Sequence, residues 1–163
     1  MKIFHLHTNF NIFFIVSRIE YGMRVPAIQL IDFGDAIDMD YYNQKETFTA
    51  IIDTENFVCC EMKEKRPWTY QTDLFGLAGT THVMLFGRYM EVEKKVISWN
   101  IKSRYPRYFD KILWEQFFTT LLNVPDCFNL PNLQALKDQF SEVLDDKEKY
   151  VRDKIAEFNK AIE

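Results

Sequence analysis

The segment from Gln71 to Phe86 constrains the fold of this chain more than any other stretch. Its apolar residues do not keep to one stripe of a helix but cover every side of it, which is the pattern of a buried helix. Asp73 in the first turn complements the helix dipole, and Gly87 directly after the last turn suits a C-terminal cap. The segment therefore predicts a buried central helix around which the other elements pack.

Most of the remaining chain is also predicted to be helical. Apolar residues at helical spacing predict three more helices, over residues 110–123, 133–144 and 147–162. A short apolar run after Pro26 predicts a strand over 27–31, and residues 92–100 predict a strand fragment. Residues 35–60 have no helical period, so we expect a long ordered loop, and such loops are usually functional. These elements predict a mainly α (α+β) fold.

Length, charge and cysteine content narrow the class of protein. The 163 residues suffice for one domain with its own core. The net charge is −4 with no basic stripe, so no direct nucleic-acid partner is expected. The apolar run near the amino terminus is too short to span a membrane, so no membrane partner is expected either. Cys59, Cys60 and Cys127 predict buried thiols in a cytosolic-type reducing compartment, with a redox pair of the first two as the alternative.

Three short motifs occur in an order that carries chemistry. An apolar strand ends in Asp32-Phe33-Gly34, Glu61 follows at the end of the long loop, and Asp73 opens the central helix. In protein kinases the aspartate of Asp-Phe-Gly binds the magnesium that bridges the ATP phosphates. The activation segment then runs to a glutamate motif, and an aspartate soon after it opens a buried helix. The order and spacing of the motifs resemble the lower lobe of a protein kinase.

Six segments narrow the resemblance to one family of kinases. They are residues 37–39, 48–50, 57–62, 67–71, 85–90 and 122–127. Their sequences are similar to those of the Bub family of mitotic checkpoint serine/threonine kinases, and the Cys-Cys-Glu-Met and Pro-Trp-x-Tyr-Gln runs are unusual for kinases at large. The resemblance extends from about residue 28 to 144. The intact Asp-Phe-Gly favours the catalytically competent Bub branch over the degenerate Bub-related branch.

The resemblance implies roles for the residues of the nucleotide site. Asp32 would hold Mg²⁺ against the phosphates of ATP, Phe33 would lie in the spine whose packing sets the active state, and Gly34 would permit the backbone turn. Residues 32–61 would form the activation segment. Magnesium and ATP are implied as cofactors of the intact family domain and are doubtful for this chain alone.

The resemblance also implies roles farther along the chain. Glu61 would anchor the end of the activation segment, and Asp73 would accept hydrogen bonds from the backbone of the catalytic loop. Thr47, Thr49 and Thr54 are candidate phosphorylation sites, although an exposed threonine in a loop is usually just solvated.

Three other sets of residues predict no functional site. His82 within the central helix is predicted to be a hydrogen-bonded core histidine. Trp68, Trp99 and Trp114 are predicted to fill the core. The acidic run from residue 32 to 40 lacks the glycine and glutamate of an EF-hand, so it predicts no calcium site.

The chain departs from the kinase pattern in its first residues. A kinase needs a catalytic-loop aspartate to accept the substrate proton and an asparagine for the second metal. No Asp occurs from Met1 to Ile31, so no catalytic residue is identified, and Asn9 or Asn11 would match the asparagine only by chance. The Gly-rich loop, the strand lysine and its helix glutamate belong to an upper lobe that we expect this chain to lack. We therefore expect the isolated chain to be inactive.

The partner of Glu61 is a separate question. Kinases usually pair this glutamate with an arginine between the last helices. Residues 123–133 contain no arginine, so the sequence leaves the partner open.

Two functions remain open, together with a structural alternative. The first is a partial Bub-type serine/threonine kinase domain, whose family phosphorylates a histone tail and works with kinetochore checkpoint proteins in the nucleus. The second is a non-catalytic scaffold or protein-binding module, in which Phe33 would offer an apolar surface to a partner. The third is an unrelated helical domain with a chance Asp-Phe-Gly. We expect a divergent leader over 1–25, the kinase-like lobe over 26–146 and an amphipathic helix over 147–163.

Overall fold

The structure is a computed structural model, which describes residues 4–6, 14–20, 23–29, 36–43, 45–51 and 58–162. Its contacts divide the chain into two compact units, residues 1–9 with 33–132 and residues 10–32 with 133–163. The domain boundaries expected from the sequence stay predictions. None of the described helices is long and apolar enough to cross a membrane.

The first unit is built on α2 (Gln71–Phe86), which has the bounds that its apolar pattern predicts. It ends at Gly87, whose φ of 66° lies in the left-handed region that favours glycine and whose N–H donates to the carbonyl of Val83 at 2.8 Å. Half of its residues are buried, but Leu77 and Met84 are exposed. The prediction of burial on every side is wrong for these two residues, because an apolar side chain is buried only where another element covers it.

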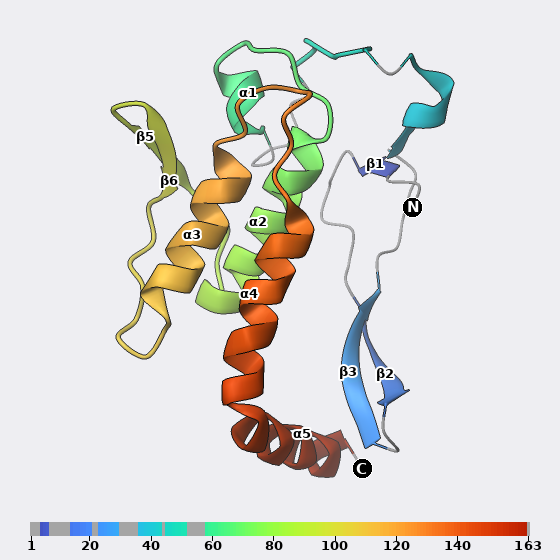
Figure 1. The fold of residues 1–163 in the computed structure, drawn as a ribbon, viewed down its shortest axis with the longest axis vertical. Coiled ribbons are helices and arrows are strands. Elements are labelled where there is room, and N and C mark those ends of the chain that lie inside the picture. Colours follow the sequence, from blue (N-terminus) through green and yellow to red (C-terminus); the bar gives the residue numbers. More distant parts are fainter. Residues whose placement is uncertain are drawn as a thin grey trace. The chain divides into compact units, whose positions relative to one another are not determined.

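The second helix of this unit, α3 (Lys111–Leu122), packs beside α2 (Figure 1). Asp110 caps its first turn by accepting a hydrogen bond from the backbone N–H of Leu113 at 3.1 Å. Its buried residues are Phe117, Phe118, Leu121 and Leu122. Burial of these large apolar side chains stabilises the helix and gives the unit much of its core.

A hairpin lies against α3. It consists of β5 (Val92–Lys95) and β6 (Ser98–Ile101), which pair antiparallel, with β6 in contact with the helix (Figure 1). The sequence predicted a single strand fragment here because the turn contains neither glycine nor asparagine. Val96 opens the turn instead, with a φ of 57° and a side chain that is 95% exposed. A β-branched residue is strained in this conformation.

Shorter elements occur in the predicted long loop. β1 (Phe4–Leu6) pairs antiparallel with β4 (Ala36–Asp38), and the 3-10 helix η1 (Met39–Tyr41) follows directly. The carboxylate of Asp38 caps η1 by accepting a hydrogen bond from the N–H of Asp40 at 3.0 Å. This part of the acidic run therefore has a structural role. At the other end of the loop, α1 (Cys60–Lys63) is a single turn that is too short to show a helical period in the sequence.

The second unit contains a hairpin and two helices. β2 (Phe14–Glu20) pairs antiparallel with β3 (Met23–Gln29), and α5 (Glu148–Ile162) packs against β3. α4 (Leu133–Asp146) precedes α5. Both helices agree with the predictions to within two residues at each end, because their apolar residues recur at helical spacing.

The strand predicted over residues 27–31 begins earlier than expected. β3 starts at Met23 and runs through Pro26, which lies opposite Ser17 of β2. Among the described residues this sheet has two strands, so each strand keeps an edge with no described neighbour, where a residue without an N–H is tolerated. Part of the predicted leader over 1–25 is therefore paired strand.

We predict that Val96→Asn stabilises the protein by about 0.5–1 kcal/mol, because asparagine tolerates a positive φ that strains a β-branched residue. Urea unfolding followed by circular dichroism measures the difference. Ile97→Asn is the matched control, since Ile97 is also exposed at the turn but has no positive φ. If both variants changed stability equally, the turn would not be strained at Val96.

Candidate functional site

The predicted nucleotide residues Asp32, Phe33 and Gly34 lie outside the residues that the structure describes. Among the residues that are described, no three His, Cys, Asp or Glu side chains gather in a way that could hold a metal ion. The site that the structure does describe is the region around α1, which forms the end of the predicted activation segment.

Glu61 is the buried centre of this region. It lies between Cys60 and Met62 in α1 and is 2% exposed. Burial raises the pKa of its carboxyl group, because the charged form loses hydration. The positive charge of Arg66 and a hydrogen bond with the Cys59 thiol act in the opposite direction.

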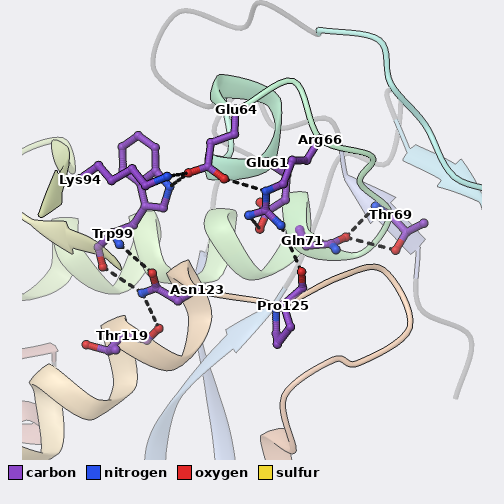
Figure 2. A network of polar contacts seen from close by, with 10 residues as sticks. All are labelled: Glu61, Glu64, Arg66, Thr69, Gln71, Lys94, Trp99, Thr119, Asn123 and Pro125. Atoms are coloured by element: carbon purple, nitrogen blue, oxygen red, sulfur yellow. Dashed lines mark hydrogen bonds and ion pairs between the residues drawn. The ribbon is translucent and has the colours of Figure 1, made fainter. Parts of the chain in front are cut away.

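Arg66 ties Glu61 to two other parts of the unit. Its Nη2 lies 3.6 Å from Oε1 of Glu61, and its backbone N–H donates to the carbonyl of Glu61 at 2.9 Å. Its Nε donates to Oε2 of Glu64 at 2.6 Å, and its Nη1 donates to the carbonyl of Pro125 at 3.1 Å. Figure 2 shows this guanidinium between the two glutamates and the loop after α3.

Glu64 continues the network towards the hairpin. Its carboxylate accepts hydrogen bonds from the ammonium of Lys94 and from the indole N–H of Trp99, the latter at 2.9 Å (Figure 2). The bonds from Lys94, Arg66 and Trp99 lower the pKa of Glu64 to about 2. Trp99 was predicted to fill the core, but it is half-buried, and its indole N–H gives it a polar role as well. The network joins α1 to β5 and β6.

Asn123 joins the same hairpin to the end of α3. Its Oδ1 accepts from the backbone N–H of Trp99 at 2.6 Å, and its Nδ2 donates to the Trp99 carbonyl at 2.9 Å. Nδ2 also donates to the carbonyl of Thr119 at 2.9 Å. The side-chain amide therefore pairs with a strand backbone in the way that a neighbouring strand would. The sequence did not identify Asn123, because a side-chain amide after a helix carries no distinctive signal.

Trp68 holds part of the loop before α1. Its backbone pairs with that of Phe48 through two hydrogen bonds of 2.9 Å, and its indole N–H donates to the carbonyl of Ala50 at 2.9 Å. The Phe48 and Trp68 rings lie 5.1 Å apart between centroids. Trp68 is 1% exposed, so the prediction that it fills the core is confirmed.

The candidate phosphorylation sites differ in their surroundings. Thr49, between the two residues that contact Trp68, is exposed, whereas Thr47 is half-buried. Thr54 lies outside the described residues. Phosphorylation of any of them stays a prediction.

Comparison with known proteins identifies relatives of this chain. No protein-family model matches the chain. Over 119 residues it is 40% identical to the mitotic checkpoint serine/threonine-protein kinase BUB1 of Mus musculus, a match that covers 73% of this chain and 11% of that protein. It is 43% identical over 107 residues to the spindle assembly checkpoint serine/threonine-protein kinase bub1 of Schizosaccharomyces pombe, covering 63% of this chain and 10% of that protein.

A solved structure agrees with the sequence matches. The crystal structure of a BubR1 kinase domain superposes with a TM-score of 0.80 and 47% identity, over 83% of this chain and 41% of that chain. The chain belongs to the Bub kinase family. It has the mainly helical fold of the lower lobe, as predicted, and it spans about a tenth of the length of the curated relatives.

In this Bub-family lobe, Arg66 is the partner of Glu61 that the sequence left open. Kinases usually supply an arginine from between the last helices, where residues 123–133 of this chain have none. The guanidinium comes instead from the connection that follows α1, and it still reaches the loop after α3 through the carbonyl of Pro125. The sequence did not indicate Arg66, because it lies outside the segment from which kinases usually supply this arginine.

Two other residues singled out in the sequence of this Bub-family lobe, His82 and Asp73, lie in α2. His82 is 1% exposed, with Nδ1 2.9 Å from the carbonyl of Arg88 and Nε2 2.7 Å from Oγ of Ser103, so the predicted core histidine is confirmed. Burial lowers its pKa. Asp73 is half-buried in the first turn of α2, and its contact with a catalytic loop stays a prediction.

The cysteines are free and buried, as predicted. Burial raises the pKa of the Cys59 thiol to about 12, and burial also raises that of Cys60. A thiol with a raised pKa is a poor nucleophile at neutral pH, so the alternative of a redox pair loses support.

We predict that Arg66→Met lowers the free energy of unfolding by about 1–3 kcal/mol, because it leaves the buried Glu61 carboxylate without its countercharge. Glu61→Gln in the same background should recover part of the loss. Urea unfolding at neutral pH measures both. Lys65→Met is the matched control, since it removes an exposed charge next in sequence. Equal losses for Arg66→Met and Lys65→Met would rule out a special role for Arg66.

We also predict opposite pH dependences for the two glutamates. The native pKa of Glu64 is lowered to about 2, so its stabilising effect is present above the ordinary value of 4.5 and is lost as pH falls towards 2. The native pKa of Glu61 is raised, so its favourable contribution exists below 4.5 and is lost as pH rises through the native value.

Unfolding at a series of pH values should therefore separate two variants. Relative to the parent, Glu64→Gln should be least stable above pH 4.5 and approach the parent near pH 2. Glu61→Gln should gain on the parent as pH rises above 4.5. If the stability of the two variants changed with pH in the same way, the environments described for Glu61 and Glu64 would be wrong.

Proposed function

We propose that the chain is the lower lobe of a Bub-type serine/threonine kinase domain that acts in spindle assembly checkpoint signalling at kinetochores. The observation that carries the proposal is the match to a BubR1 kinase domain at 47% identity over 83% of this chain. The order of Asp-Phe-Gly, Glu61 and Asp73 in the sequence supports it independently.

In this proposal Asp32, Phe33 and Gly34 form the lower side of the nucleotide site. Asp32 would hold Mg²⁺, and bound magnesium neutralises charge on the phosphates of ATP. Asp73 would fix the backbone of the catalytic loop. Glu61 would anchor the end of the activation segment, a role supported by its burial and by its ion pair with Arg66.

The proposed substrate is a protein, a histone tail by resemblance, and the proposed partners are kinetochore checkpoint proteins in the nucleus. The names of the relatives support the checkpoint assignment, since they are mitotic and spindle assembly checkpoint kinases. The mixed surface charge and the absence of a basic stripe agree with a protein partner.

The isolated chain is proposed to be catalytically inactive. No aspartate precedes Asp32 in its 163 residues, so that stretch lacks the catalytic-loop aspartate that accepts the proton of the substrate hydroxyl in kinases. Phosphoryl transfer relies mostly on positioning and electrostatics. Loss of the groups that position the substrate and stabilise the charge of the transferred phosphate therefore removes most of the rate. The same observation favours the second candidate, a non-catalytic kinase-like scaffold that binds other proteins.

We predict that the purified 163-residue chain transfers no phosphate from Mg-ATP to histone protein above a blank without the chain. Transfer of radiolabelled phosphate measures this. Robust transfer that Asp32→Asn abolishes would contradict the proposed inactivity.

A chimaera tests the lobe itself. Residues 26–146 would replace the matching segment of an active BUB1 kinase domain from one of the relatives. The proposal predicts an active chimaera that Asp32→Asn inactivates, whereas Asp145→Asn, a matched loss of an exposed carboxylate, leaves it active. A folded chimaera without activity would favour the scaffold.

A further inference from the structure

The first unit contains a cavity that the kinase assignment does not use. It lies between the β5–β6 hairpin, the loop that follows it and α3, and its volume is about 520 Å³. This size falls in the range of cavities that bind small molecules or a few residues of a peptide, roughly 300–1,000 Å³. Two buried apolar residues, Ile101 and Phe118, form part of its lining.

Basic residues dominate the charged lining. Four cationic side chains face two carboxylates in a chain whose net charge is −4, so this surface differs in sign from the protein as a whole. The cations are Lys95, Lys102, Arg104 and Lys111, and the anions are Glu93 and Glu115.

Two of the four cations already have partners. Lys95 lies 2.8 Å from a carboxylate oxygen of Glu93, and Lys102 lies 2.9 Å from one of Glu91, a residue outside the lining. Within the described part of the chain, Arg104 and Lys111 have no ion pair. Two positive charges are therefore available at the cavity.

One carboxylate of the lining, that of Glu115, partly offsets the positive charges of Arg104 and Lys111. Glu115 lies close enough to Tyr105 for its charge to contribute to the raised pKa of that phenol, about 12, of which burial is the main cause. The available lining thus holds a guanidinium and an ammonium against one carboxylate. A group with nearly two negative charges fits this balance better than a single carboxylate does.

We propose that this cavity binds a phosphorylated serine or threonine in a segment of a partner protein. The fork of N–H groups on Arg104 matches the oxygens of a phosphate, and Lys111 adds a second charge. The cavity is much larger than a phosphate ion, and the apolar part of its lining, Ile101 and Phe118, can contact the residues that flank the phosphorylated one. These two features favour a phosphopeptide over free phosphate. The proposal is independent of the nucleotide site and of catalysis.

Fluorescence anisotropy with the full 163-residue chain tests the proposal. The probe is a labelled peptide with one phosphoserine between apolar residues, compared with the same peptide without phosphate. We expect the phosphorylated form to bind at least about tenfold more tightly, the effect of one charged hydrogen bond, and to weaken as salt is raised. Equal binding of the two peptides, or no binding of either, would overturn the proposal.

Charge variants locate the site. Arg104→Gln and Lys111→Gln should each weaken the phosphopeptide about tenfold. Arg107→Gln is the matched control, because Arg107 is exposed in the same loop but does not line the cavity, and it should have little effect. Glu115→Gln should tighten binding, a gain that a misfolded variant cannot produce. An equal loss for Arg107→Gln and Arg104→Gln would show nonspecific attraction and overturn the site.

Competition distinguishes the sources of phosphate. Inorganic phosphate should displace the labelled peptide only at much higher concentration than the unlabelled phosphopeptide. Displacement at equal concentrations would overturn the peptide assignment in favour of a free-phosphate site. Tighter binding of a single-stranded oligonucleotide than of the phosphopeptide would overturn it in favour of nucleic acid.

Discussion

The guanidinium of Arg66 joins the end of the predicted activation segment to the rest of the first unit. It faces the buried carboxylate of Glu61, the half-buried carboxylate of Glu64 and the carbonyl of Pro125. A buried carboxylate is costly unless a countercharge or hydrogen bonds compensate it. Arg66 compensates Glu61 from a connection only a few residues away, so the position of α1 does not depend on an arginine from the last helices.

The polar contacts around Arg66 continue into the elements that carry the core. Glu64 passes the network to Lys94 and Trp99 of the hairpin, and Asn123 then connects the hairpin backbone to the end of α3. The apolar packing of α2 against α3 supplies the stabilising burial, while the polar contacts set where the short elements lie. This arrangement places the proposed phosphate cavity on the side of the hairpin that α3 covers.

Parts of the fold with a long, regular pattern were predictable from the sequence. α2, α3, α4 and α5 were expected within about two residues of their observed ends, since periodicity and caps such as Asp110 and Gly87 are local signals. α1 and the β5–β6 turn were missed, because one helical turn has no period and Val96 is not a turn former. β3 was placed too late because Pro26 was taken as a boundary.

The long helices, the membership of the Bub family and the order of Asp-Phe-Gly, Glu61 and Asp73 could all be derived from the amino-acid sequence. These depend on residue identity and spacing, which are local or can be compared directly between sequences. The folded chain was needed to reveal the partner of Glu61, the role of Asn123 and the charge balance of the cavity. Asn123 and the cavity bring together residues from distant positions. Arg66 is only a few residues from Glu61, but several other charged residues lie equally near in the sequence, and no pattern along the chain specifies which of them will meet.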